Sequence, residues 1–307
     1  MPRPRRICFK FALVLCSSVA FILAHRAYKD QARQSKPSTN QLVAPVTYYS
    51  AHGQDRWILD NILSHAGNKS MFTFVEAGSY DGLTGSNMAA FELRYGWTGL
   101  CYEPNPVMFE LVKQRRPKCE KFNAVICDAK QAAGGTKYYY RQLAAPYQQE
   151  SGIFELMDSY KQDLVKQYTV EAELQVSCRS LSEDIKTYLN GQLDFLSLDV
   201  EGAELIVLQT IDWEQVSVDI IMVERSHEKQ VHEFLVGRNF HHVALVGHDN
   251  VFVHKRSRFI EAYMAGCSCK LRGECKSAKV YPDAGWLNCE KLESEALEVS
   301  YTNKVET

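Results

Sequence analysis

Outside its first 40 residues, the chain lacks the excess of basic residues that nucleic-acid-binding proteins typically carry. Residues 1–40 hold eight of the 35 Lys and Arg residues but only one of the 37 Asp and Glu residues. The rest therefore has 27 basic and 36 acidic residues, a net charge of −9. This balance disfavours nucleic acid and anionic membrane surfaces as partners of the main domain. The sequence also shows no internal repeat, and so no sign of a repeat architecture.

C-x-x-C pairs, which are typical of zinc sites, are also absent. The C-terminal segment has instead the spacing Cys267-x-Cys269-x5-Cys275, followed by Cys289. Eight cysteines follow the N-terminal hydrophobic run, and this even number favours disulfides in an oxidising compartment. We therefore expect a disulfide-stapled extension at residues 257–307, although the sequence does not select one pairing.

Long hydrophobic runs are absent except for residues 7–24, which contain one charged residue, Lys10. A helix of this length spans about 27 Å, enough to cross the hydrocarbon core of a bilayer. The basic residues of the preceding MPRPRR favour a cytoplasmic tail at residues 1–6. We predict a signal anchor at residues 7–24 in a single-pass type II membrane protein facing the ER or Golgi lumen. A cleaved signal peptide and secretion are the alternative.

The polar residues 25–47 predict a flexible stem. The motif Asn68-Lys69-Ser70 is a candidate N-glycosylation site, which agrees with a lumenal location. The main domain is expected to span residues 48–256.

Apolar segments and helical segments alternate from about residue 50. This alternation predicts an α/β fold with a doubly wound, mainly parallel sheet. The expected strands are residues 72–77, 100–103, 122–127, 194–200 and 219–224, closed by the pair 242–246 and 251–254. The first expected helix carries Trp57, Ile58, Ile62 and Leu63 on one face, and a second starts at Ser86 or Asn87. Two more follow the N-caps Asn105 and Ser180. The last two cover residues 203–210 and 228–236. Residues 129–176 break the rhythm; they contain a polar, helix-like stretch, 155–174, and are expected to form an insertion that covers a substrate site.

The segment FVEAGSYDGLTGSN, residues 74–87, ends a strand in glycines yet lacks both common phosphate-binding motifs. It contains neither G-x-x-x-x-G-K-[ST] nor G-x-G-x-x-G, and no Lys or Arg lies between Gly78 and Asn87. It reads E-x-G-x-x-x-G, with Glu76, Gly78 and Gly82. Glu76 and Asp81 would repel a pyrophosphate but attract a ligand with an ammonium and a sulfonium. S-adenosylmethionine carries both groups and is the predicted cofactor.

Two further acids follow the next expected strands. Glu103 lies 21 residues after Gly82, where α/β nucleotide-binding folds place a carboxylate on the ribose hydroxyls. Asp128 follows the third strand and is expected near the adenine. The predicted cofactor-binding residues are Glu76, Gly78, Ser79, Asp81, Gly82, Asn87, Glu103, Asp128 and Asp199.

Four segments resemble the FkbM-type methyltransferases, namely GQD at 53–55, FVEAGSYDG at 74–82, GWTGLCYEPNP at 96–106 and DFLSLDVEGAE at 194–204. The resemblance covers about residues 49–254, and LDVEGAE is its most specific element. It implies a class I S-adenosylmethionine-dependent methyltransferase fold and methyl transfer to a hydroxyl oxygen, often on a sugar. Many bacterial members carry Lys where this chain has Ser197, so no role of that lysine is carried over.

Methyl transfer to oxygen needs a hydroxyl held in line with the methyl group and a base that takes its proton. Asp199 and Glu201, after the fourth strand, are candidate catalytic residues. Glu224 and His227, after the fifth strand, are the others, and a neutral His suits a base near neutral pH. Alternatively, Asp199 caps the next helix, Glu201 orients the loop, and His227 is an exposed first-turn residue after Ser226 as N-cap. No ligand spacing demands a metal, and none is expected.

The sequence thus predicts a membrane-anchored, lumenal O-methyltransferase whose acceptor is a glycan or another hydroxyl-bearing molecule. The alternative is a non-catalytic, methyltransferase-like membrane protein that serves as a trafficking or folding partner of secretory cargo. Loss of the cofactor acids would favour that alternative, and they are intact. The acids of the first turn disfavour a third possibility, a nucleotide-sugar enzyme.

Overall fold

The computed structural model describes residues 47–64, 71–261, 263 and 284–285, which belong to one compact unit, Val46–Thr307. The predicted cytoplasmic tail and anchor, nearly all of the stem, Asn68 and the tail cysteines lie outside the described residues. Among the residues that are described, no helix is both long and apolar enough to span a bilayer.

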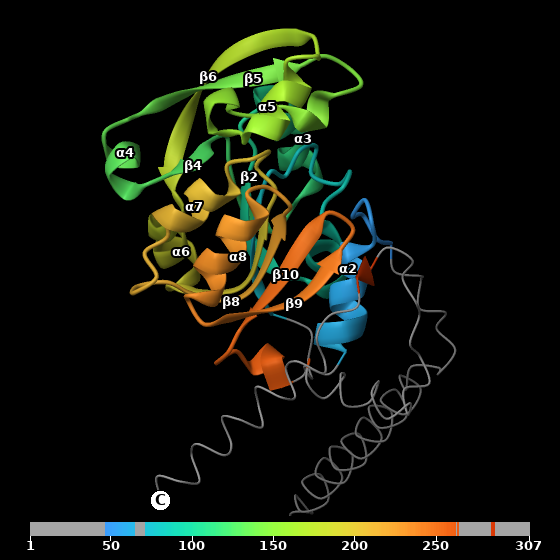
Figure 1. Cartoon of the computed structure of the whole chain (residues 1–307). Coiled ribbons are helices and arrows are strands. Elements are labelled where there is room, and N and C mark those ends of the chain that lie inside the picture. Colours follow the sequence, from blue (N-terminus) through green and yellow to red (C-terminus); the bar gives the residue numbers. More distant parts are fainter. Residues whose placement is uncertain (1–46, 65–70, 262, 264–283, 286–307) are drawn as a thin grey trace, which may run out of the picture. The chain divides into compact units, whose positions relative to one another are not determined.

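The centre of the unit is a sheet of eight strands (Figure 1). In spatial order they are β11 (Ala284–Gly285), β9 (Phe240–Val246), β10 (Asp249–His254), β8 (Ser217–Glu224), β7 (Gln192–Leu198), β1 (Thr73–Ala77), β2 (Thr98–Tyr102) and β3 (Cys119–Phe122). From β8 to β3 all neighbours are parallel, whereas β10, β9 and β11 pair antiparallel. The prediction of a mainly parallel α/β sheet is confirmed.

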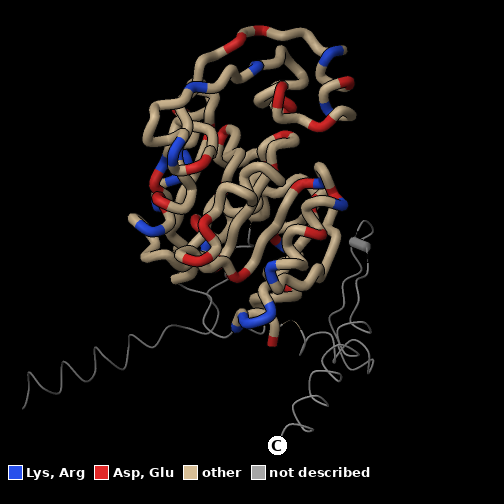
Figure 2. The backbone as a smooth tube through the Cα atoms, turned by 60° about the vertical axis from the view of Figure 1, so that its left-hand side comes forward, with Lys and Arg blue, Asp and Glu red and all other residues tan. Residues whose placement is uncertain are grey.

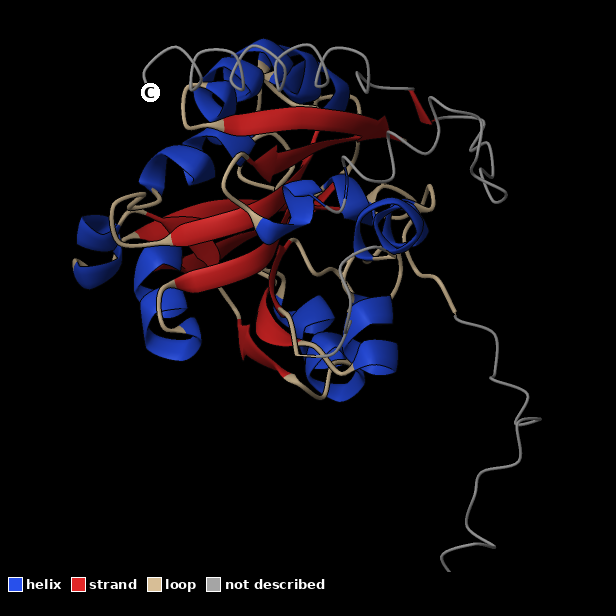
Figure 3. Cartoon of the chain, turned by 90° about the horizontal axis from the view of Figure 1, so that it is seen from below, coloured by secondary structure: helices blue, strands red, loops and turns tan. Residues whose placement is uncertain are grey.

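Successive residues of the central strands face two different hydrophobic cores, because side chains alternate along a strand. Phe74 and Phe195 pack in one core, while Val75 and Leu196 pack in the other. Helices lie on both sides of the strands (Figure 3). Residues of α2 (Gln54–Ile58), η1 (Leu59–Leu63), η2 (Phe91–Tyr95) and α3 (Pro106–Arg115) contribute to the first core, and residues of α6 (Leu181–Leu189), α7 (Glu204–Thr210) and α8 (Glu228–Val236) to the second. The sheet is therefore buried on both faces, as a doubly wound fold requires.

Local capping explains where several helices begin and end. Asn105 accepts hydrogen bonds from the backbone N of Val107 at the start of α3, and Pro106 occupies its first turn. Ser180 accepts from the backbone N of Glu183 at the start of α6. Both N-caps were predicted, and both are confirmed. The predicted apolar face of Trp57, Ile58, Ile62 and Leu63 is also confirmed, since all four are buried.

Three expected elements differ from the structure. Residues 122–127 are not one strand: β3 ends at Phe122, and β4 (Val125–Cys127) pairs in a second sheet. Asn123 stabilises the turn between them by donating to the carbonyls of Glu103 and Pro104. The helix expected from Ser86 or Asn87 begins at Ala89, whose backbone N donates to the Ser86 hydroxyl. Residues 155–174 are helical only in part, because β6 starts at Val170.

The residues expected as an insertion supply β5, most of β6 and several helical turns, and together with β4 they form a second, three-stranded sheet. The elements of this region are α4 (Ala129–Ala133), β5 (Lys137–Leu143), η3 (Gln148–Glu150), η4 (Phe154–Leu156), α5 (Ser159–Val165) and β6 (Val170–Ser180), and β6 lies between β5 and β4 in the sheet. Four described cysteines form two disulfides, Cys101–Cys119 between β2 and β3 and Cys127–Cys178 between β4 and β6. The second disulfide fastens the insertion to the strand that leads into it.

Candidate active site

A cavity of about 240 Å³ lies where β1, β2, β7 and β8 end, and residues of the insertion form part of its wall. The strand order reverses here, because β1 has β2 on one side and β7 on the other. Ligands of open α/β sheets typically bind at such a switch point. The lining includes six carboxylic acids, namely Glu103, Glu150, Asp199, Glu201, Glu224 and Asp249. No Lys or Arg is among the described residues that line it.

Basic and acidic residues are interspersed over the described part of the chain (Figure 2). The surplus of acids in the cavity is therefore a local feature, produced by the strand ends and the insertion that meet there.

Gly78 directly follows β1 and allows the turns after β1 and β7 to touch. Its φ is 87°, a conformation that L side chains rarely adopt, and a Cβ there would lie 1.8 Å from the carbonyl O of Asp199. The backbone N of Asp199 in turn donates to the carbonyl O of Ala77 at 3.1 Å. Glycine is thus required by this approach, and both Gly78 and Asp199 line the cavity.

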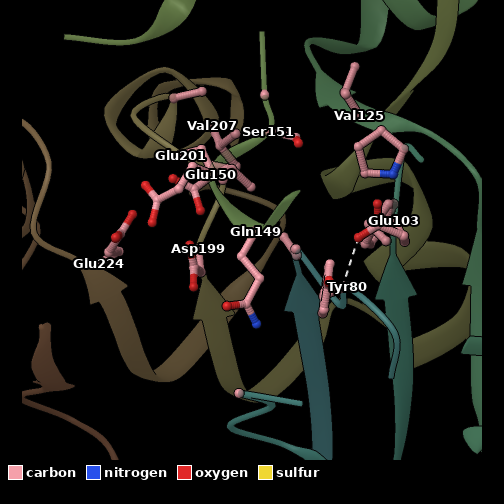
Figure 4. Close-up of a pocket in the computed structure, with 18 of the residues that line it drawn as sticks. Tyr80, Glu103, Val125, Gln149, Glu150, Ser151, Asp199, Glu201, Val207 and Glu224 are labelled. Carbon is pink, nitrogen blue, oxygen red and sulfur yellow. Dashed lines mark hydrogen bonds between the residues drawn. The ribbon is translucent and has the colours of Figure 1, made fainter. Parts of the chain in front are cut away.

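Glu103 follows β2 and lines the opposite end of the cavity (Figure 4). Its two carboxylate oxygens accept one backbone hydrogen bond each, from Tyr80 and Asn105, both at 2.8 Å. Each oxygen retains a lone pair that can accept from a further donor, such as a hydroxyl. Burial raises the pKa of Glu103 to about 8 although both hydrogen bonds act to lower it.

Glu76 and Asp81, the acids of the first turn, do not line the cavity. Glu76 pairs with the guanidinium of Arg116 and accepts a hydrogen bond from Ser86. Asp81 pairs with Arg115 at 2.6 Å. The two acids therefore have a different role from the expected attraction of a cationic ligand, since the end of α3 neutralises both and so fixes the turn.

Two more residues of this turn support it without lining the cavity. The Ser79 hydroxyl donates to the carbonyl O of Glu76. Gly82 has a φ of 88°, and a Cβ there would lie 3.2 Å from the Cγ of Arg116. Ser79 therefore stabilises the turn from within, whereas Gly82 allows the turn to pack closely on the end of α3.

Asn87 and Asp128, the remaining predicted cofactor residues, are placed differently from one another. Asn87 is buried and lines the cavity; its Nδ2 donates to Ser197 Oγ at 3.1 Å, whereas its Oδ1 has no hydrogen-bond partner among the described residues. Asp128 does not line the cavity and instead caps α4 by accepting from the backbone N of Gln131. The split of the third strand explains this, because it directs the chain after Cys127 into the insertion.

Three of the four candidate catalytic residues converge. Asp199, Glu201 and Glu224 each contribute a carboxylate oxygen to a group in which these atoms lie within 4.8 Å of one another (Figure 4). Burial is the main cause that raises the pKa of Asp199 and Glu201 well above the ordinary range, and repulsion from the neighbouring carboxylates is the second. Burial and nearby acids, Glu204 first, raise the pKa of Glu224 to about 7. The three carboxylates therefore titrate as a coupled group, in which Glu224 is the member poised near neutral pH.

The loop that carries Glu201 is held by a buried acid. The Oε1 of Glu204 accepts from the backbone N of Val200 at 2.9 Å and of Gly202 at 3.1 Å. Glu201 between them has a φ of 58°, which is uncommon for a residue with a side chain. Glu204 thus determines how the Glu201 side chain is presented, a role that no sequence expectation assigned to it.

His227, the fourth candidate, does not line the cavity. It is the N-cap residue of α8 with a φ of 44°. Ser226, expected as that N-cap, instead donates its hydroxyl to the carboxylate of Glu204. The expectation for Ser226 was wrong because this side chain turns toward the loop after β7 rather than toward α8.

Several cavity residues were not identified as site residues from the sequence. Gln54 donates from Nε2 to Asp249 Oδ2 at 2.5 Å, and burial raises the pKa of Asp249 to about 6. Glu150 enters from the insertion. Gln54 lies within the quoted segment GQD and could have been found there, whereas Asp249 and Glu150 follow no recognisable motif.

A sheet with a cavity at its switch point, a glycine turn after β1 and an acid after β2 fits the class I methyltransferase fold. Residues 76–254 match the family model described as "Methyltransferase FkbM domain", and the chain belongs to this family. The cofactor of these methyltransferases is S-adenosylmethionine.

Three solved structures to which the chain is similar are methyltransferases. The FkbM methyltransferase of Methylobacillus flagellatus KT is 10% identical with a TM-score of 0.35, and the alignment covers 61% of this chain and 44% of that one. The TehB-like enzyme of Corynebacterium glutamicum is 13% identical with a TM-score of 0.31, covering 76% and 99%. A methyltransferase of Aquifex aeolicus is 11% identical with a TM-score of 0.30, covering 65% and 92%. No curated protein matches the chain.

The cavity residues fit S-adenosylmethionine. The Oδ1 of Asn87, which has no hydrogen-bond partner among the described residues, is a buried acceptor. Gly78 lets the turns after β1 and β7 meet at the cavity, and Glu103 offers two carboxylate oxygens to hydroxyl donors. Glu103 would hold the ribose hydroxyls, and the Gly78 turn with Asn87 would hold the amino-acid portion.

Proposed function

We propose that this protein is an S-adenosylmethionine-dependent O-methyltransferase that modifies a hydroxyl of a glycan or glycoconjugate in the secretory lumen. The observation that carries the proposal is the convergence of Asp199, Glu201 and Glu224 in the same cavity as Glu103 and the Gly78 turn. One end of the cavity thus fits a cofactor, and the other end holds groups that can accept a proton.

When bound, the cofactor supplies a methyl group on a cationic sulfur. The crowded carboxyl groups of Asp199, Glu201 and Glu224 favour a cation in this cavity, because a cation relieves the repulsion between their ionised forms. The acids that attract the cationic cofactor are thus at the ends of β7 and β8, and not at Glu76 and Asp81 as expected.

The acceptor hydroxyl loses its proton as its oxygen becomes methylated, and the chain must take this proton. Glu224 is the best suited base, because its pKa of about 7 lets the same group accept a proton and release it near neutral pH. Asp199 and Glu201 are close enough to accept a hydrogen bond from the same or an adjacent hydroxyl. These acceptors orient the hydroxyl, and Glu224 takes up its proton.

The acceptor class and the compartment rest on separate observations. Carboxylates that accept hydrogen bonds, with no Lys or Arg among the described lining residues, suit a polyhydroxyl acceptor better than an anionic one. The two disulfides and the predicted anchor at residues 7–24 support a lumenal, membrane-bound enzyme. Nucleic acid is not a proposed partner, since the main domain is acidic.

Calorimetric titration of the purified full chain with S-adenosylmethionine tests the cofactor step. We expect saturable binding, and no detectable heat at millimolar cofactor would overturn the proposal. Mass spectrometry of glycans from cells that express the unaltered chain or Glu201→Gln tests the acceptor. A methyl-sized increment on a hexose should disappear with Glu201→Gln and persist with Glu183→Gln, an exposed control on α6. Cofactor binding without any glycan change would favour the non-catalytic alternative, a partner of secretory cargo.

A further inference from the structure

We propose that Lys161, a residue of the insertion, is a positioning residue of the methyl transfer: its ammonium pairs with Glu201, favours the ionised form of this carboxylate and orients it at the acceptor end of the cavity. This inference rests on the proposed function, to which it adds a residue that neither the FkbM segments nor the strand ends supply.

Lys161 lies in the first turn of α5 and contacts two carboxylates. Its Nζ is 2.5 Å from the Oε2 of Glu150 and also pairs with the Oε2 of Glu201. The side chains of Lys161 and Glu201 are each 14% exposed. Because both charges are largely withdrawn from water, this pair is screened much less than an ordinary surface pair.

The backbone around Lys161 is fixed, so the ammonium is delivered to a defined place. Asp158 caps α5 by accepting from the backbone N of Lys161 at 2.7 Å. Gln162 donates from Nε2 to the carbonyls of Phe154 and Met157, both at 3.1 Å. These bonds join the start of α5 to the turn before it.

The insertion is packed directly against the loop that carries Glu201. A Cβ at Gly152 would lie 3.1 Å from the Cβ of Glu201, and one at Gly202 would lie 2.9 Å from the Cα of Met157. The two segments have no room for larger residues between them. Lys161 therefore reaches Glu201 across a close contact.

The charges around Glu201 show what the ammonium does. Burial and the carboxylates of Glu224 and Glu150 raise the pKa of Glu201, whereas the ammonium of Lys161 lowers it. Asp199 also faces this cluster, and Asp249 and Glu204 lie near its other members. Burial lowers the pKa of Lys161, but Glu201 and Glu224 raise it more, so the lysine stays charged. Removing this cation favours protonation of Glu201, which then orients an acceptor hydroxyl less strongly.

The test is a carboxyl ¹³C NMR titration of Glu201 in the full chain, with its resonance assigned by its loss in Glu201→Gln. Lys161→Met should move the midpoint to higher pH by about one unit or more. Lys161→Arg should leave the midpoint of the Glu201 titration close to that of the unaltered chain, because the cation is retained. The matched control is Lys166→Met, which removes an exposed lysine at the other end of α5 that pairs with Asp163.

A purely structural role for Lys161 predicts a different outcome. Lys161→Met would then lower the melting temperature without moving the Glu201 midpoint, and that result would overturn the inference, as would an equal shift in Lys166→Met. If Lys161→Met does not fold, Lys161→Gln takes its place, since it keeps hydrogen-bond donors but removes the charge.

The failure of this inference is distinguishable from the failure of the proposed function. Absence of cofactor binding by the unaltered chain would overturn the function, yet the Glu201 titration would still report on Lys161. Where the unaltered chain methylates its acceptor, Lys161→Met should shift the rising limb of the pH–rate profile to higher pH. The Kd for the cofactor, measured at a pH above this rising limb, should be the same in Lys161→Met and in the unaltered chain. An unshifted limb would overturn the role of Lys161 while the function stands.

Discussion

The buried guanidinium of Arg116 pairs with the carboxylate of Glu76. The same guanidinium pairs with Glu92 at 2.6 Å, and the exposed fractions of the three side chains are 0% for Arg116, 4% for Glu76 and 0% for Glu92. One cation at the end of α3 thus pairs with an acid at the end of β1 and with another in η2. The acid that opens the glycine turn is therefore held in the interior and is not presented to a ligand.

Arg116→Met should reduce the free energy of unfolding by about 3–5 kcal/mol, because it leaves two buried carboxylates without their partner. Urea denaturation of the full chain measures this loss. Arg115→Met is the matched control: Arg115 is 35% exposed and pairs with Asp81, so its loss should be about 1 kcal/mol or less. Equal losses in the two variants would contradict the burial argument.

Gly78→Ala should lower the cofactor affinity at least about tenfold and destabilise the fold, because its Cβ would collide with the backbone of Asp199. Gly135→Ala provides the control, since Gly135 also has a positive φ of 69° but has nothing within 4 Å of its added Cβ. Only the conformational cost, about 1–2 kcal/mol, is expected there. Calorimetric titration and denaturation of both variants separate the collision from that cost. Unchanged cofactor affinity in Gly78→Ala would exclude this turn from the binding site.

Glu103 should make the ligand-free protein less stable as the pH rises. Its pKa is about 8 in the folded chain and 4.5 as a model value, so between these values the unfolded chain loses a proton that the folded chain keeps. The contribution of Glu103 to the free energy of unfolding is therefore complete below about pH 4.5 and is lost as the pH rises toward 8. This free energy decreases by at most about 1.4 kcal/mol per pH unit through Glu103. Denaturation at pH 5 and pH 8 should show a smaller decrease for Glu103→Gln than for the unaltered chain. Glu120→Gln, on the exposed face of β3, should behave like the unaltered chain.

The two disulfides should contribute unequally to stability. Cys127–Cys178 closes a separation of 51 residues and Cys101–Cys119 one of 18, which correspond to about 4 and about 3 kcal/mol in the chain-entropy model. Thermal unfolding of the two paired Cys→Ala variants, compared with the unaltered chain, measures the difference. A larger loss from removing Cys101–Cys119 would show that contacts in the folded state outweigh loop closure.

Much of the sheet could be predicted because its signals are local. Apolar strand segments followed by capped helices predicted the doubly wound sheet, and the helix caps at Asn105 and Ser180 follow from side chains only two or three residues away. The positions of Glu103 and Asp199 at strand ends also placed them in the cavity, since parallel strands end at the same edge. These inferences need only sequence order and periodicity.

The partners of the charged groups could not be predicted in the same way. Glu76 meets Arg116 across 40 residues, and Glu201 meets Lys161 through an insertion that follows no strand–helix rhythm. A carboxylate at a strand end is equally compatible with a ligand, a helix cap or an ion pair. Spacing along the chain does not distinguish these, because the choice depends on which distant side chain is packed beside it.

The sequence by itself determined the fold class, the edge of the sheet that binds a ligand and the family to which the chain belongs, because these depend on local patterns and short motifs. Only the tertiary structure decided which acids face the cavity. It placed Glu76 and Asp81 against the arginines of α3 and brought Asp199, Glu201 and Glu224 together beside Lys161. Burial and charge pairing arise from contacts between segments far apart in the chain, so they appear only once those segments are packed.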